Sequence, residues 1–77
     1  MQTVVDIELD LSGLTCPMPL LKAKQALNRM KSGQVLKVLA TDPGSERDFQ
    51  VFADQSGNML LDFENIDGTF GYWIQKR

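Results

Sequence analysis

The chain has 77 residues, of which 43% are hydrophobic and 23% charged, with a formal net charge of −2. This length predicts a single small domain over residues 1–77, which buries only about 60–65% of its unfolded surface on folding. The negative net charge argues against nonspecific nucleic-acid binding, which needs a strong cationic field. The chain has no histidine and one cysteine, Cys16. We therefore expect no internal disulfide, no metal site and no cofactor.

Export and membrane insertion are not indicated by the sequence. The first residues, Met1–Thr3, carry no charged side chain, and no apolar run approaches the ~18 residues of a membrane helix. A single cysteine does not require an oxidising compartment. The expected location is therefore the reducing cytoplasm.

The first half of the chain predicts a strand, a helix and a second strand. Residues 4–11 alternate between apolar and acidic side chains, which is typical of a half-buried strand. From Pro17 to Ser32 the apolar spacing becomes helical, with Gly33 as the expected residue after the helix. Its inward positions are Leu20, Ala23, Leu27 and Met30. Residues 34–41 are apolar nearly throughout, which predicts a central strand.

The second half predicts one more helix and a hairpin. Ser45 and Asp48 resemble a capping box before a helix over residues 46–56, which Gly57 should end. Alternation through Met59, Leu61 and Phe63 predicts an inward-facing set on a strand over residues 59–65. Asp67-Gly68 is a strong hairpin signal, and a last strand covers residues 70–75.

The order of elements is therefore β-α-β-α-β-β. The helix between the first two strands is long enough for a parallel crossover connection. We predict an α/β (α+β) two-layer sandwich, in which two helices cover one face of a four-stranded mixed sheet.

Cys16 lies where a loop should meet the start of the first predicted helix. A free cysteine is often a buried small hydrophobe, but Ser12-Gly13 before it and Pro17 after it indicate an exposed junction. Pro17 suits the first helical position, and Pro19 still lies in the first turn. Unpaired N–H groups at a helix N-terminus favour an anion, and thiol pKa values at such sites can fall. Cys16 is therefore the candidate reactive residue.

Four further features admit both a functional and a plain structural interpretation. Lys22 and Lys24, on the basic side of the first helix, form either a partner surface or a solvated face. The loop that starts at Asp42 either holds an anion or only caps a helix. Arg47 is placed against the helix dipole, which weakly suggests a use. Trp73 should lie on the sheet face away from the helices, as a contact residue or as shielding for a sheet edge.

The run Leu9–Pro19 resembles the signature of the TusA/SirA/YedF family of small sulfur-carrier proteins. That signature is a leucine-aspartate strand end, a glycine-leucine loop containing Gly13, and Cys-Pro-x-Pro at a helix start. Similar residues recur downstream at Gly33-Gln34, Thr41–Ser45, Arg47-Asp48, Asp67-Gly68 and Tyr72–Lys76. The resemblance spans nearly the whole chain, from about Leu9 to Lys76.

The resemblance implies a fold related to the C-terminal domain of translation initiation factor three. It also implies a sulfurtransferase activity within a protein relay, in which Cys16 receives sulfane sulfur as a persulfide and passes it to a partner's cysteine. A cysteine desulfurase or rhodanese would be the donor, and tRNA thiolation, molybdenum-cofactor assembly or sulfur oxidation the destination. A monomer without membrane or direct nucleic-acid contact is expected. Some family members carry a basic residue where this chain has Thr15.

Cys16 and its supports Gly13, Pro17 and Pro19 form the expected carrier site. Expected partner contacts are Thr15, Met18, Lys22, Lys24, Asp42 and Arg47. Two other classes stay open at this point: a redox-responsive regulatory or interaction domain built on Cys16, and an RNA-binding module suggested by the relation to the initiation factor. The sequence does not separate the redox domain from a carrier.

Overall fold

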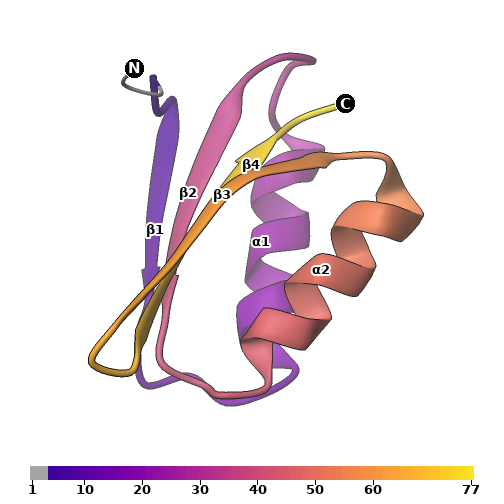
Figure 1. Cartoon of the computed structure of the whole chain (residues 1–77). Coiled ribbons are helices and arrows are strands. Elements are labelled where there is room, and N and C mark those ends of the chain that lie inside the picture. The colour runs from indigo at the N-terminus through magenta and orange to yellow at the C-terminus, as the bar shows by residue number, and fades with distance from the viewer. Residues whose placement is uncertain (1–3) are drawn as a thin grey trace.

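In the computed structural model, which describes residues 4–77, two helices pack against one face of a four-stranded sheet (Figure 1). Met1–Thr3, which entered the prediction of no signal peptide, lie outside the described residues. In chain order the elements are β1 (Ile7–Leu11), α1 (Met18–Asn28), β2 (Val35–Ala40), α2 (Ser45–Ser56), β3 (Met59–Ile66) and β4 (Thr69–Gln75). The predicted order and the two-layer α/β architecture are confirmed.

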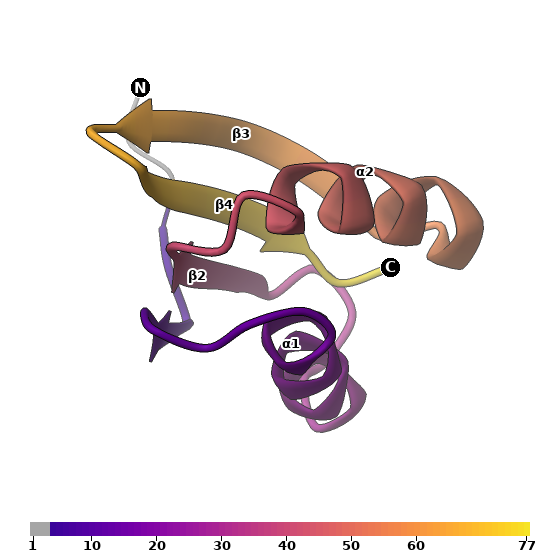
Figure 2. The same ribbon diagram turned by 90° about the horizontal axis from the view of Figure 1, so that it is seen from below.

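The sheet has the strand order β1-β2-β4-β3, with β1 parallel to β2 and the other pairs antiparallel. Both helices lie on the same side of it (Figure 2). Because β1 and β2 are parallel, their carboxyl ends meet at one edge of the sheet. The loops that follow these two strands therefore run side by side, at the bottom of Figure 1.

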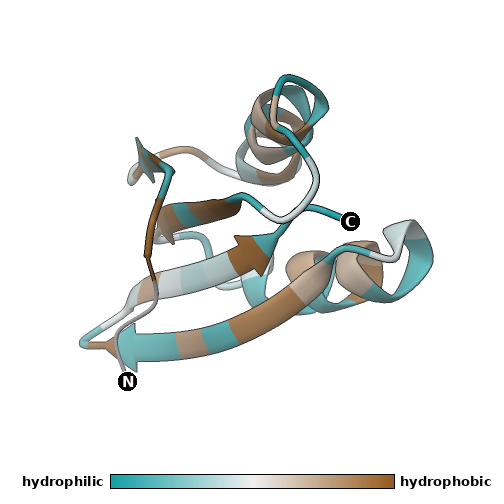
Figure 3. Ribbon diagram, turned by 90° about the horizontal axis from the view of Figure 1, so that it is seen from above, coloured by the Kyte–Doolittle hydropathy of each residue, from teal (hydrophilic) through white to brown (hydrophobic). Residues whose placement is uncertain are grey.

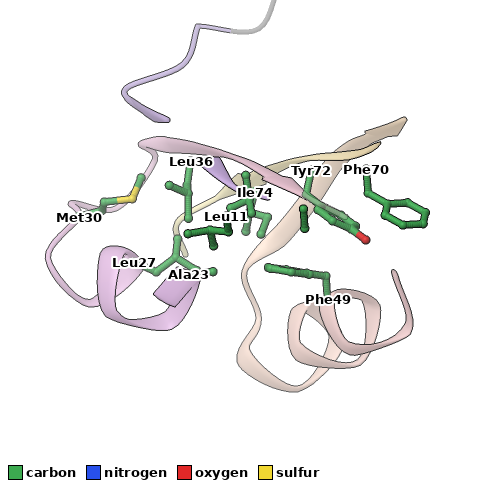
Figure 4. Close-up of a cluster of buried hydrophobic side chains, with 11 residues drawn as sticks. Leu11, Ala23, Leu27, Met30, Leu36, Phe49, Phe70, Tyr72 and Ile74 are labelled. Atoms are coloured by element: carbon green, nitrogen blue, oxygen red, sulfur yellow. The ribbon is translucent and has the colours of Figure 1, made fainter. Parts of the chain in front are cut away.

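The core lies between the inner face of the sheet and the two helices (Figure 4). Ala23 and Leu27 of α1 are fully or almost fully buried, as predicted from their spacing. On the α2 side, Phe49 stacks on Tyr72 of β4 with ring centroids 4.4 Å apart, and both side chains are 0% exposed. Burying a side chain of this size contributes roughly 1.5–3 kcal/mol, so α2 is firmly fixed on the sheet.

The predicted end of α1 and the predicted start of α2 were wrong. The helix α1 ends at Asn28 and not at Ser32, because the N–H of Met30 turns back to the carbonyl of Leu27 and its side chain enters the core. Gly33, with φ of +90°, therefore lies in the turn before β2 and not directly after the helix. At α2 the N-cap is Gly44, and Ser45 is already helical. The predicted end of α2 at Gly57 is confirmed by its φ of +79°.

The face assignment in β3 was wrong for Met59 and Leu61 and right for Phe63. Met59 and Leu61 are 60% and 39% exposed, whereas Leu60 and Phe63 pack against the core. A bulge between Leu60 and Asp62 shifts the register, and an extra residue of this kind moves later side chains to the other face. Figure 3 shows hydrophilic and hydrophobic bands mixed along this edge strand. The hairpin prediction is confirmed, with positive φ at both Asp67 and Gly68.

Trp73 faces away from the helices and is half-buried. Its ring lies 5.0 Å from Lys37 Nζ, and a Cβ built on Gly71 would come within 3.3 Å of it. Shielding of a sheet edge is excluded as its role, because β4 is an internal strand.

Candidate functional site

The loop between β1 and α1 presents Cys16 and is anchored at several points. Ser12 N–H donates to Asp10 Oδ1 at 3.1 Å, and hydrogen bonds from Ser12 lower the pKa of the Asp10 carboxyl. Gly13 N–H donates to Thr41 Oγ1 at 2.8 Å across the sheet edge. Gly13 has φ of +84°, which other residues rarely adopt. Leu14 packs against the core, so the segment leading to Cys16 is tied to both the sheet and the interior.

The start of α1 differs by one residue from the prediction. Met18 is the first helical residue, and Pro17 is the N-cap without any side-chain capping bond. Pro19 is the second helical residue and is buried, so it packs in the interior in addition to shaping the backbone. Met18 N–H donates to the carbonyl of Thr15 at 2.9 Å, which closes the turn around Cys16.

Cys16 is exposed, as the sequence predicted. Its thiol donates a hydrogen bond to Asp48 Oδ2 at 3.2 Å, between residues 32 apart in the sequence. Asp48 belongs to the first turn of α2. The candidate reactive residue on one helix start is thus held by a carboxylate on the other.

The electrostatics of Cys16 contradict the expectation of an acidic thiol. The hydrogen bond to Asp48 raises the pKa of the Cys16 thiol above its ordinary value, and desolvation and the charges of Asp48 and Asp42 act in the same direction. Few backbone N–H groups are available to stabilise a thiolate, because Cys16 lies two residues before the first helical residue and both Pro17 and Pro19 lack an N–H. The carboxylates at the second helix start therefore act against the stabilisation of a thiolate that was expected from the first.

Asp42 lies in the loop before α2 and is half-buried. Its Oδ2 atom is buried without a hydrogen-bond partner among residues 4–77, and its carbonyl accepts from Ser45 N–H at 3.0 Å. With Glu46 and Asp48 in the first turn of α2, this end of the molecule is acidic. The setting disfavours the anion site that was one interpretation of the loop.

Ser45 does not cap α2 as the sequence predicted. Its side chain is 2% exposed, and its Oγ lies 2.7 Å from the hydroxyl oxygen of Tyr72. Asp48, the expected partner in the capping box, instead accepts from Cys16. The two residues of the predicted motif are thus divided between the core and the candidate site.

A groove of about 350 Å³ separates α1 from α2, beside Asp48. Its lining residues are Leu20, Lys24, Arg47, Asp48, Val51, Phe52 and Gln55. Lys24 Nζ lies 5.5 Å from the Phe52 ring centroid. The structure thus brings Lys24 and Arg47 to one groove, while Lys22 is exposed outside it. Thr15 and Met18, which flank Cys16 and Pro17 in the sequence, are both exposed.

Another hollow, of about 550 Å³, lies at the other end of α2 and includes Ala53, Gly57 and Leu60 in its lining. It does not include Cys16. Within residues 4–77, no group of three or more cysteine, aspartate or glutamate side chains is placed to hold a metal ion. No helix in this part of the chain is long and apolar enough to cross a membrane.

Sequence reasoning did not find Asp48 and Thr41 as parts of this site. Asp48 was interpreted as a capping residue and Thr41 as the end of a strand, and both also belonged to the family resemblance. Neither was expected to contact the segment that carries Cys16. One signal was available: the prediction of parallel first and second strands already places the two following loops at one edge of the sheet. Polar side chains in the second loop are therefore candidates for contact with the first.

Comparison with known proteins agrees with this fold. The family described as sulfurtransferase TusA matches residues 7–76. A sulfur carrier protein TusA from Allochromatium vinosum is 56% identical over 71 residues, which cover 92% of this chain and 93% of that protein. One from Pseudomonas putida GB-1 is 42% identical over 72 residues, covering 94% and 90%. The crystal structure of a SirA-like protein from Desulfitobacterium hafniense superimposes with a TM-score of 0.79 at 30% identity, covering 90% and 95%.

The sheet order, the two helices on one face and the Cys-Pro-x-Pro junction define a small TusA/SirA-like α/β sandwich. This chain belongs to the TusA family.

Proposed function

We propose that this chain is a sulfur carrier that works as one domain over residues 1–77 and holds sulfane sulfur as a persulfide on Cys16. The observation that carries the proposal is the single exposed cysteine at the loop-to-helix junction of a TusA-family chain. Two relatives in this family are named sulfur carrier proteins. A lone cysteine suits a carrier, because no second thiol of the chain can resolve the persulfide into an internal disulfide.

The transfer is an exchange without net oxidation. Cys16 Sγ attacks the terminal sulfur of a donor persulfide with its electron pair, and the new S–S bond forms. The old S–S bond breaks, its electron pair leaves with the donor sulfur, and the proton from the Cys16 thiol ends on that sulfur. Delivery to an acceptor cysteine repeats these steps with Cys16 as the leaving group. No metal or cofactor takes part in this scheme.

The proposed donor is a cysteine desulfurase or rhodanese, and the proposed acceptor is a cysteine of another relay protein. The sulfur then serves tRNA thiolation, molybdenum-cofactor assembly or sulfur oxidation. Both partners must bring a sulfur within bonding distance of Cys16, so the surface around it is the proposed docking face. That face comprises Thr15, Met18, Lys22, Lys24, Asp42 and Arg47. We place the monomeric carrier in the cytoplasm, where reducing conditions keep its thiol free.

A redox-responsive domain is the second candidate function, and the exposed thiol is the observation in its favour. Redox-sensor cysteines are typically accessible and of low pKa. The raised pKa of Cys16 opposes this role. A carrier tolerates a protonated resting thiol, because it meets its sulfur inside a donor complex where the proton can pass to the leaving donor sulfur.

The test is to incubate the chain with a cysteine desulfurase and cysteine and then measure its intact mass. We expect a gain of one sulfur atom that is lost on reduction. A parallel incubation with hydrogen peroxide in place of the donor tests the redox alternative. Oxygen addition under peroxide, with no sulfur gain from the desulfurase, would favour the sensor over the carrier.

A further inference from the structure

The backbone that carries the Asp48 carboxylate is anchored on both sides by buried neighbours. Asp48 lies between Ser45, whose hydroxyl contacts Tyr72 in the core, and Phe49, which is 0% exposed and stacked on the same tyrosine. The position of α2, and with it the Asp48 backbone, is therefore fixed by buried contacts. The loop that carries Cys16 is tied to the same edge through Gly13 and Thr41. The 3.2 Å contact thus joins two separately anchored segments.

The hydrogen bond between Cys16 and Asp48 requires a proton on the Cys16 sulfur, and this requirement is not met when Cys16 carries a persulfide. An ionised carboxylate only accepts hydrogen bonds, so the Cys16 sulfur must supply the proton. The thiol does so, and the pKa of Cys16 is raised accordingly. A hydropersulfide is a stronger acid than the corresponding thiol and is largely ionised at neutral pH. An anionic persulfide has no proton to donate and is repelled by Asp48 and by Asp42, the two carboxylates that act on this sulfur.

We propose that Asp48 is a positioning residue of the carrier site, which holds the unloaded Cys16 thiol against α2 and releases the sulfur when Cys16 carries a persulfide. This inference rests on the proposed function. In the unloaded chain the thiol is held as a hydrogen-bond donor. In the loaded chain the terminal sulfur turns away from α2 and is presented to the acceptor. The site thereby distinguishes its empty state from its full state without any larger rearrangement.

The first test measures alkylation of unloaded Cys16 by iodoacetamide, a neutral reagent, between pH 6 and 11. The variants are Asp48→Asn, which keeps an oxygen acceptor and removes the charge, and Asp48→Glu, which keeps the charge. The matched control is Asp54→Asn, which makes the same change at an exposed position further along α2. Circular dichroism verifies that each variant is folded.

We expect Asp48→Asn to shift the alkylation profile to lower pH and to react several-fold faster at pH 7, because the thiolate fraction rises. Asp54→Asn should match the original chain, and Asp48→Glu should restore much of its profile. Coinciding profiles for the original chain and Asp48→Asn would overturn the holding role. If Asp48→Asn does not fold, the Asp48 carboxyl ¹³C resonance of the original chain serves instead: it should move as Cys16 titrates, and a constant resonance overturns the role.

The second test follows the same carboxyl resonance when Cys16 is loaded with inorganic polysulfide, with the sulfur content verified by mass. Loading should change the resonance, and reduction should restore it. An unchanged resonance in a chain that carries the sulfur overturns the release. A chain that takes up no sulfur from polysulfide is loaded with a cysteine desulfurase and cysteine instead. Uptake from neither source overturns the proposed function and the release with it, while the alkylation profiles still decide whether Asp48 holds the thiol.

Discussion

The starts of α1 and α2 are joined by the contact between Cys16 and Asp48, but they differ in which residues they expose and which they bury. The start of α1 contains Pro17 and Pro19 and leaves Cys16 exposed. The start of α2 places Ser45 in the core and adds acidic residues in its first turn. One start displays a sulfur, and the other anchors a helix on the sheet.

The difference shows how a reactive residue can be exposed and still be well positioned. Two hydrogen bonds position the segment before α1 against the segment that leads into α2. They run from Gly13 to Thr41 and from Cys16 to Asp48. An electrostatic consequence follows, because the acidic anchoring start raises the pKa of the Cys16 thiol. The largest cause of the raised pKa of Cys16 is thus its hydrogen bond to Asp48, 32 residues away in the sequence.

The largest effect should come from Cys16→Ser. We expect complete loss of sulfur acceptance, because the chain has no other cysteine. The free energy of unfolding should change by less than about 0.5 kcal/mol, as is typical of exposed positions. Mass spectrometry after incubation with a donor and urea denaturation measure the two quantities. Sulfur uptake by the variant, or its failure to fold, would contradict the assignment of Cys16 as an exposed carrier residue.

A large loss of stability is expected instead when the contacts that hold the start of α2 on β4 are removed. Tyr72→Ala removes a fully buried ring that stacks on Phe49 and should cost about 3–5 kcal/mol of unfolding free energy. Tyr72→Phe keeps the ring and removes only the partner of the Ser45 hydroxyl, which should cost about 1–3 kcal/mol. Urea denaturation gives both values. If the two variants lost equal stability, the hydroxyl contact and not the ring stacking would be the main anchor.

The proposed docking face predicts an effect on rate. Lys22→Glu with Lys24→Glu should slow sulfur uptake from a donor enzyme several-fold, and most strongly at low salt, because rim charges mainly affect association. Between the single variants, Lys24→Glu should have the larger effect, since Lys24 lines the groove beside Asp48. Alkylation of Cys16 by iodoacetamide should be unaffected.

The matched control for this pair is Arg29→Glu with Lys31→Glu, which makes the same charge change at exposed residues beyond the other end of α1. Equal slowing in both double variants would show that net charge matters and that the groove does not. Unchanged uptake in the Lys22 and Lys24 variant at low salt would identify this helix surface as a solvated face.

The smallest effects are expected at the prolines. Pro17→Ala should cost about 0.4–1 kcal/mol through greater freedom of the unfolded chain. Pro19→Ala should cost more than Pro17→Ala, because Pro19 is also buried. Both variants should slow sulfur transfer more than their stability loss explains, since they loosen the turn that presents Cys16. Urea denaturation and single-turnover transfer rates test this. Unchanged transfer in the double variant would show that the prolines only mark the start of α1 and do not contribute to transfer.

Local patterns were sufficient to predict most of the fold. The apolar spacing at Ala23 and Leu27, the Asp67-Gly68 turn and Gly57 after α2 depend on near neighbours in the chain, and the structure confirms them. The bulge between Leu60 and Asp62 depends on pairing with β4, so strict alternation assigned Phe63 correctly to the inner face but Met59 and Leu61 wrongly. The end of α1 was overestimated because Met30 turns into the core after the helix has ended.

The candidate site was predictable in part for the same reason. The exposed position of Cys16 followed from its flanking Gly13 and Pro17. The raised pKa did not, because its cause is Asp48, which reaches Cys16 only once α2 is seated on the sheet. A capping box is a local pattern, and the tertiary contacts of Ser45 and Asp48 replaced it with two different hydrogen bonds.

The most direct test of the account is to locate the added sulfur. The chain is incubated with a cysteine desulfurase and cysteine, blocked with iodoacetamide, digested, and measured by high-resolution mass spectrometry with and without prior reduction. We predict one extra sulfur atom on the peptide that contains Cys16, absent after reduction. A sulfinic acid adds two oxygens of nearly the same mass but survives reduction. A modification that resists reduction, or a Cys16 peptide without added sulfur, would contradict the claim that Cys16 carries sulfur.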